Sequence, residues 1–139
     1  MKIITALLLL LFSTTARAQS TLGLTLSELL SQYQRSASMT DWREGTNAVG
    51  GKYVMFEESG TQLITASYFT PVSNSLEDLV TATVLMGPAD KFLQFFAEDC
   101  NERYNIMGHH KWLDTKNRIN INLTENDGLA VLRFTAWHK

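Results

Sequence analysis

The sequence has 139 residues, of which 45% are hydrophobic and 19% charged, with one cysteine and a formal net charge of −2. This length leaves room for one ordinary domain, and the apolar content is too high for a disordered chain. One cysteine cannot form a disulfide within the chain, which excludes a small cross-linked scaffold. The near-neutral charge, without a run of basic residues, argues against a general nucleic-acid-binding protein.

The N-terminus has the pattern of a secretory signal peptide. Lys2 precedes an apolar run over residues 3–12, and the small residues of Ala16-Arg17-Ala18 suit signal peptidase. The run is shorter than the ~20 residues that span a bilayer, and an uncleaved anchor is the alternative. We therefore expect a signal peptide over residues 1–18 and one domain over residues 19–139. The mature chain is expected to be periplasmic, or else secreted, without a stable membrane anchor.

Two segments have helical patterns. Thr25-Leu26-Ser27-Glu28 matches a capping box, and the apolar spacing that follows predicts a helix over residues 26–36. A second helix is predicted over residues 89–104, where Pro88 suits the first turn. Between them, residues 37–51 contain three glycines and are predicted to form a loop. The second helix has an apolar stripe that is expected to face the core: Phe92, Phe95, Phe96, Cys100 and Tyr104.

Alternating apolar residues and turn residues predict two β-hairpins. The first joins residues 52–57 to 62–69, and its two apolar faces suggest cover on both sides. The second joins residues 118–124 to 129–137 through an Asp-Gly turn. Residues 75–86 combine helical spacing with β-branched residues, which favours a helix, with a strand as the alternative. The expected fold class is α+β: a small single domain with two or three helices packed on an antiparallel sheet of about four strands.

The candidate catalytic group is Cys100, with His109 or His110 as its base. A reactive thiol needs an accessible, cationic setting. Cys100 instead lies in the apolar stripe with acidic residues nearby, which favours a buried structural cysteine. The adjacent histidines point in different directions and no further ligand pattern accompanies them, so neither a metal site nor a cofactor is expected. A small Cys/His hydrolase or transferase remains an alternative function.

Two tryptophans stand beside charged residues in predicted loops: Trp42 next to Arg43, and Trp112 next to Lys111. Trp and Arg are favoured anchors of protein interfaces, although each tryptophan can instead cap an edge of the core. From these four residues we expect a non-catalytic interaction protein of the bacterial envelope that binds a protein partner as an inhibitor, immunity or accessory factor. A carrier of a small hydrophobic ligand is a further alternative. No nucleic-acid partner is expected, and the oligomeric state is left open.

Overall fold

The computed structural model describes residues 21–33, 39–48, 50–58, 60–72 and 75–136, without the side chains of residues 39–42. The predicted signal peptide therefore lies outside the described residues, as do the last residues of the first predicted helix. No helix among the described residues is long and apolar enough to cross a membrane.

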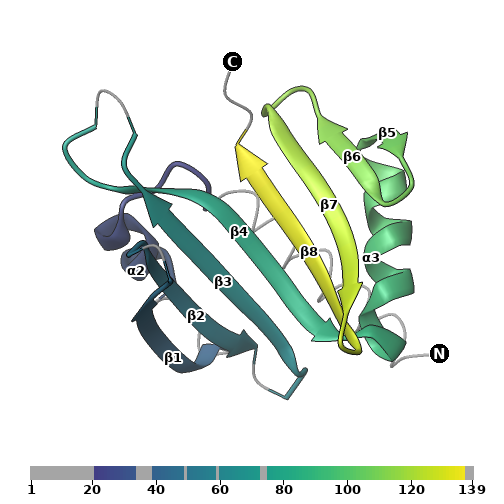
Figure 1. Ribbon diagram of the computed structural model, residues 1–139, viewed down its shortest axis with the longest axis horizontal. Helices are drawn as coiled ribbons and strands as arrows, with labels where there is room; N and C mark the ends of the chain where they lie inside the picture. The colour runs from purple at the N-terminus through teal and green to yellow at the C-terminus, as the bar shows by residue number, and fades with distance from the viewer. Residues whose placement is uncertain (1–20, 34–38, 49, 59, 73–74, 137–139) are drawn as a thin grey trace.

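Two helices and eight strands make up the described part of the chain (Figure 1). The helices are α2 (Leu26–Tyr33) and α3 (Ala89–Arg103). All eight strands form one antiparallel sheet, so the expected sheet of about four strands is wrong. The strands are β1 (Met39–Thr46), β2 (Lys52–Glu58), β3 (Leu63–Thr70), β4 (Leu79–Pro88), β5 (Asn105–Gly108), β6 (Lys111–Asp114), β7 (Ile119–Asn126) and β8 (Leu129–Ala136).

The same arrangement of elements occurs twice. A helix followed by four antiparallel strands, α2 with β1–β4, is succeeded by a second such unit, α3 with β5–β8. The strand order β1-β2-β3-β4-β8-β7-β6-β5 joins the units through their last strands, β4 and β8, which pair antiparallel. The topology thus has an approximate two-fold axis perpendicular to the sheet, between β4 and β8. We call these parts the α2 unit and the α3 unit.

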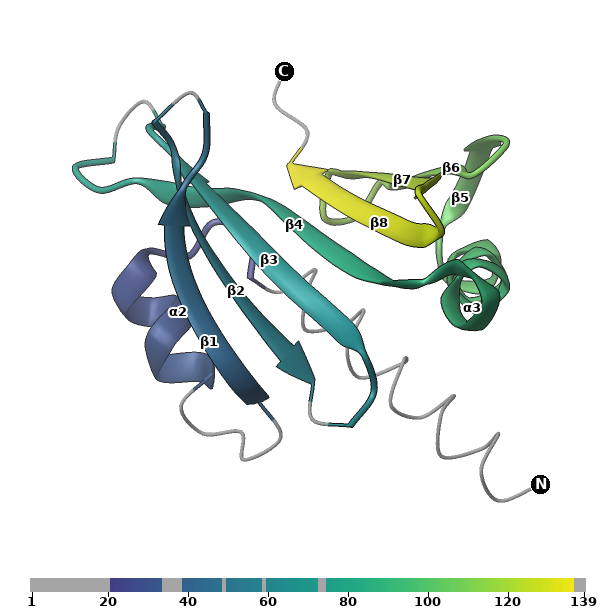
Figure 2. The ribbon, with the colours of Figure 1, turned by 60° about the horizontal axis from the view of Figure 1, so that its bottom comes forward.

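Both helices lie on the same face of the sheet, which Figure 2 shows from the side. Phe56, Thr65, Leu85 and Leu132 are paired in turn across β2, β3, β4 and β8, so their side chains share that face. Phe56 packs in the cluster of α2, whereas Leu132 packs in the cluster of α3. No helix of the described residues covers the opposite face of the sheet, although Ala66 of β3 and Val84 of β4 are buried on that face.

The helices bury two separate apolar clusters. The α2 cluster joins Leu29 and Tyr33 of the helix to four residues of the α2 unit's sheet: Val54, Phe56, Phe69 and Val80. The α3 cluster contains Phe92, Phe96 and Cys100, which confirms the predicted apolar stripe, together with Trp112 and residues of β7 and β8. Leu63 and Leu85 of the α2 unit also belong to the α3 cluster, so the two units share a core across β4 and β8.

The start of α2 is held by its capping box and by β4. As predicted, the Glu28 amide donates to Thr25 Oγ1 (3.2 Å), and the Thr25 amide donates to a Glu28 carboxylate oxygen (3.4 Å). Immediately before the helix, the Gly23 amide donates to the Val80 carbonyl (2.8 Å), and the Val80 amide donates to the Leu24 carbonyl (2.9 Å). These bonds fix the distance between the beginning of α2 and the sheet.

Both predicted hairpins are confirmed, as β2–β3 and β7–β8. Residues 75–86, for which a helix was favoured, instead contribute most of strand β4. β4 pairs with β3 on one side and, from Ala82 onward, with β8 on the other, so it is a central strand of the sheet. Its β-branched residues suit this buried central position better than a helix, which explains why the helical spacing was misleading.

Three further strands were missed. β1 occupies part of the predicted loop over residues 37–51, and the short hairpin β5–β6 follows α3. Both predicted loop tryptophans therefore lie on strands, Trp42 on β1 and Trp112 on β6. β1 and β5 are the outermost strands of the sheet, so each pairs with a neighbour on one side only. Edge strands often carry charged residues, and their sequences alternate less clearly between apolar and polar residues.

Candidate functional site

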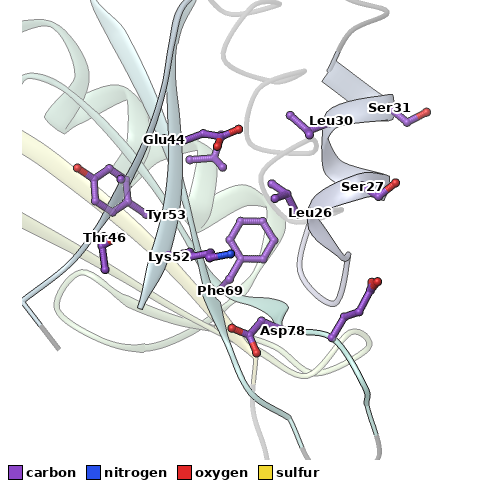
Figure 3. Close-up of a pocket in the computed structure, with 13 residues that line it drawn as sticks. Leu26, Ser27, Leu30, Ser31, Glu44, Thr46, Lys52, Tyr53, Phe69 and Asp78 are labelled. Atoms are coloured by element: carbon purple, nitrogen blue, oxygen red, sulfur yellow. The ribbon is translucent and has the colours of Figure 1, made fainter. Parts of the chain in front are cut away.

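An open groove of about 980 Å³ lies between α2 and the strands at the outer end of its unit (Figure 3). Leu26 and Leu30 form the wall on the helix, and Figure 3 shows both side chains pointing toward the strands. Val54 and Phe69, which belong to the buried α2 cluster, form the apolar floor. Among the described residues, the groove is the space between α2 and the part of the helix-bearing face that β1 and β2 form.

Charged side chains surround this apolar floor. Glu44 of β1 points toward α2 in Figure 3, and Asp78 lies below Phe69 at the other end of the groove. Glu77 also lines that end, and Lys52 of β2 stands between the two ends. All four charged residues are exposed, so the rim carries three carboxylates and one ammonium group. An apolar centre with a charged, solvated rim is the usual anatomy of a protein-binding surface.

The four residues predicted to bind a partner do not form one site. Arg43 is exposed on β1 and Lys111 is exposed on β6, and five strands lie between β1 and β6 in the sheet. Trp42 lies on β1, but its side chain is outside the described part of the chain. A partner that contacted both Arg43 and Lys111 would therefore have to span most of the width of the sheet.

Trp112 has the position of a core residue. Only 3% of its surface is exposed, and its Nε1 donates a hydrogen bond to Asn101 Oδ1 of α3 (2.9 Å). It pairs with Ile121 of β7 and belongs to the α3 cluster. This placement matches the alternative in which the tryptophan caps an edge of the core, because so little of the ring is open to a partner. The next strand, β5, instead exposes Ile106 (62%) and Met107 (65%), which the sequence reasoning did not single out.

Cys100 is fully buried in the α3 cluster. Burial, and secondarily the charge of Asp99, raise its pKa from 9.0 to about 12, against a smaller lowering by Arg103. Asp99 and Arg103 form an ion pair on α3 with 3.1 Å between the Arg103 Nε and a carboxylate oxygen. The thiol is therefore protonated at neutral pH and has no access to a substrate in this conformation.

The thiol is expected to resist alkylation in the native chain. With a pKa near 12, the nucleophilic thiolate stays a minor species from pH 7 to 9, and burial excludes the reagent. In denaturant, the thiol regains an ordinary pKa and is expected to react fully within minutes. Mass spectrometry after iodoacetamide treatment measures both states. Rapid labelling of the native chain at pH 7 would revive the Cys/His enzyme as a functional hypothesis.

His109 and His110 form the turn between β5 and β6. Their rings stack with centroids 3.9 Å apart, so the expectation that they point in different directions is wrong: His110 has a φ of 54° in this turn, unlike a residue of a regular strand or helix. The ring of His110 also lies 6.2 Å from that of Trp112. Partial burial of the ring is the main cause that lowers the pKa of His110, and the electrostatic effect of the nearby His109 is the second. Within the described residues, no group of three or more His, Cys, Asp or Glu side chains is placed to hold a metal ion.

The groove was not predicted because its residues come from separate segments: α2, β1, β2, β3 and the residues before β4.

No protein-family model matches the chain, and no significant match was found among curated proteins or solved structures. The class that the fold and groove define is a two-unit, antiparallel-sheet protein with both helices on one face. The site's own chemistry is therefore the basis for a functional proposal.

Proposed function

We propose that the chain is a binding protein that receives a segment of a protein partner in the groove between α2 and strands β1 and β2. The observation that carries this proposal is the apolar floor of Val54 and Phe69 inside a rim of exposed charges. Apolar side chains of a partner gain free energy by burial on this floor, at about 25 cal/mol for each Å² removed from water. The rim charges contribute orientation and specificity more than affinity.

The groove supports binding better than catalysis. The one free thiol lies in the other unit, buried and protonated, and no histidine or cysteine is among the described residues that line the groove. A carrier of a small hydrophobic ligand is the second candidate, favoured by Leu26 and Leu30 above the same floor. A peptide matches the surface more completely, because it brings polar backbone and charged side chains to the rim together with apolar side chains.

Export to the periplasm, or secretion, is part of the proposal and is supported by the N-terminal sequence alone. Lys2, the apolar run and the Ala16-Arg17-Ala18 site support it. N-terminal sequencing of the exported protein is expected to begin at Gln19. An intact N-terminus in a membrane fraction would favour the anchor instead.

The groove can be filled from within to test its role. Leu30 is half-buried and points toward the strands, so Leu30→Trp places an indole in the groove without removing a fully buried side chain. Glu102→Trp on the exposed surface of α3 is the matched control. In quantitative affinity capture from a periplasmic extract, the amount of a specific partner recovered is expected to fall at least tenfold with Leu30→Trp. It is expected to stay unchanged with Glu102→Trp.

Folding of each variant is checked by its thermal midpoint. Equal capture by wild type and a folded Leu30→Trp variant contradicts the groove as the binding site. If Ile106→Lys on β5 abolishes capture and Leu30→Trp does not, the partner binds the exposed apolar residues of β5 instead of the groove.

A further inference from the structure

The face of the sheet opposite α2 and α3, which we call the helix-free face, is apolar over the α2 unit. Strand alternation places Tyr53 and Met55 of β2 on this face, because their neighbours Val54 and Phe56 are buried toward α2. Tyr53 pairs with Tyr68 of β3, and their ring centroids lie 6.0 Å apart. Five half-buried side chains form what we call the helix-free patch: Tyr53, Met55, Ile64, Tyr68 and Met86.

Strand β7 of the α3 unit is polar on the same face. It directs Asn120, Asn122 and Thr124 to the helix-free side, whereas Ile121 and Leu123 are buried on the helix side. This is the alternation of a sheet with one face in water. β2 departs from it, because Tyr53 and Met55 are apolar although no described helix covers them. The helix-free patch is therefore the part of this face that is suited to a binding partner.

Three cations lie on the helix-free face in one row across the sheet. Arg43, Arg133 and Lys111 are exposed, and directly paired residues have their side chains on the same face. By the pairing of the described strands, Glu57 is the one acidic residue on this face. The face is therefore net cationic, although the chain has a formal net charge of −2. In the row each residue pairs with the next: Arg43, Met55, Ala66, Val84, Arg133, Asn122 and Lys111.

Two of these cations stand on either side of the patch. Arg43 of β1 precedes Met55 in the row, and Arg133 of β8 follows Val84. Four strand spacings separate the two arginines, a distance of about 19 Å along the row. A partner on this surface thus meets apolar side chains in the middle and a guanidinium group at each side. Arginine is the side chain best suited to bind a carboxylate, because its planar group donates two parallel hydrogen bonds.

The charges also decide between classes of partner. A second copy that presented the same face would bring cations against cations, which disfavours such a pair. A nucleic acid gains affinity mainly from many phosphate contacts, and three cations beside an apolar centre offer few. Apolar side chains with carboxylates at both ends match the surface in hydrophobicity and in charge.

We propose that the helix-free patch is a second binding surface, which receives a segment of a protein partner whose apolar side chains lie between two carboxylates. The apolar side chains cover Tyr53, Met55 and Tyr68, and the carboxylates pair with Arg43 and Arg133. This surface lies on the opposite face of the sheet from the groove. It therefore goes beyond the proposed function and can be tested apart from it.

Three heptapeptides test the apolar and the acidic requirement separately. In an extended peptide Asp-Ser-Leu-Ser-Phe-Ser-Asp, both apolar side chains and both carboxylates lie on one face, and its ends are about 20 Å apart. The peptide is acetylated, amidated and titrated into the purified chain, with the backbone amides of Met55, Ala66 and Val84 as reporters by NMR. It is expected to bind at least fivefold more tightly than Lys-Ser-Leu-Ser-Phe-Ser-Lys or Asp-Ser-Ser-Ser-Ser-Ser-Asp. The Leu30→Trp variant, which fills the groove, is expected to bind it within twofold of the wild type.

The charge requirement is assigned to residues by a double variant. Arg43→Gln, Arg133→Gln is expected to bind the acidic and basic apolar peptides within twofold of each other. The matched control is Lys116→Gln, Arg118→Gln, which removes two exposed cations from the turn between β6 and β7 and should keep the fivefold preference.

The apolar requirement is assigned in the same way. Met55→Thr is expected to weaken binding of the acidic apolar peptide at least threefold. Asn122→Thr, in the same row but on the polar strand β7, should leave it unchanged. The thermal midpoint of each variant verifies that it is folded.

Equal binding of the three peptides, absence of shifts with all of them, or an unchanged charge preference in Arg43→Gln, Arg133→Gln overturns the inference. Tighter binding of single-stranded oligothymidylate at the same amides would show a phosphate-binding surface instead. Self-association of the wild type in size-exclusion chromatography, abolished by Met55→Thr, would show that a second copy occupies the patch. The proposed function fails separately, when Leu30→Trp leaves partner capture unchanged.

Discussion

Replacing Phe96 with alanine is expected to lower the free energy of unfolding by about 3–5 kcal/mol. Phe96 is fully buried in the α3 cluster, and its ring stacks on Phe92 with centroids 5.6 Å apart. Truncation removes buried apolar surface and leaves a cavity between α3 and the sheet, and both effects favour unfolding. Small domains are stable by only about 5–15 kcal/mol, so the midpoint of urea unfolding should fall markedly.

Glu102→Ala supplies the control on the same helix. Glu102 is exposed, so its replacement should change the free energy of unfolding by no more than about 0.5 kcal/mol. A Phe96→Ala variant as stable as Glu102→Ala would show that α3 does not pack on the sheet through Phe96.

Replacing Trp112 with alanine is also expected to cost about 3–5 kcal/mol. The indole is buried against Ile121, and its N–H bond to Asn101 joins β6 to α3. Trp112→Ala should therefore leave a cavity between β6 and α3. Urea unfolding measures the loss, and Trp112→Phe, which keeps an aromatic ring, is expected to lose less.

Free indole provides a direct readout of that new space. A ligand that binds only the folded state stabilises it by about 1.4 kcal/mol at ten times its dissociation constant. Indole is therefore expected to raise the thermal midpoint of Trp112→Ala by more than that of the wild type. An equal effect on both proteins would show that removal of Trp112 does not create an aromatic-sized site.

Local patterns in the sequence were sufficient for the elements that carry strong periodicity. The strand around Ile119 and Ile121 alternates between buried and half-buried residues, and its hairpin turns at Asp127 and Gly128. Both turn residues have positive φ, 50° and 79°, which a short twisted hairpin requires. The stripe through Phe92 and Cys100 predicted the buried face of α3 for a similar reason, since helical period and burial coincide.

The remaining strands depend on neighbours that are distant in the sequence. β4 became a strand because β3 and β8 complete its hydrogen bonds on both sides, which no local pattern records. β1 contains Arg43, Glu44 and Gly45 and lies at the sheet edge, so its sequence resembles a loop. The number of strands was therefore underestimated, and with it the relation between the two halves.

The groove could not be predicted from the sequence either, because it depends on contacts between segments that are distant in the chain. Leu30, Glu44, Lys52 and Asp78 are ordinary surface or amphipathic residues when each is considered in its own segment. They line one groove only when the α2 unit folds and brings their segments together. Trp112 shows the converse: charged neighbours in the sequence suggested an exposed ring, whereas strand alternation directs Lys111 outward and the indole inward.

Because the two units related by the approximate two-fold axis between β4 and β8 belong to one chain, their sequences can differ. A homodimer of one helix and four strands, paired through the last strand, would form a sheet of the same order. Its halves would be identical, so an indole that closed one helix–sheet opening would close the other as well. A single chain is free of that constraint. Here one half buries Trp112 beside its helix, while the other has an open groove beside α2.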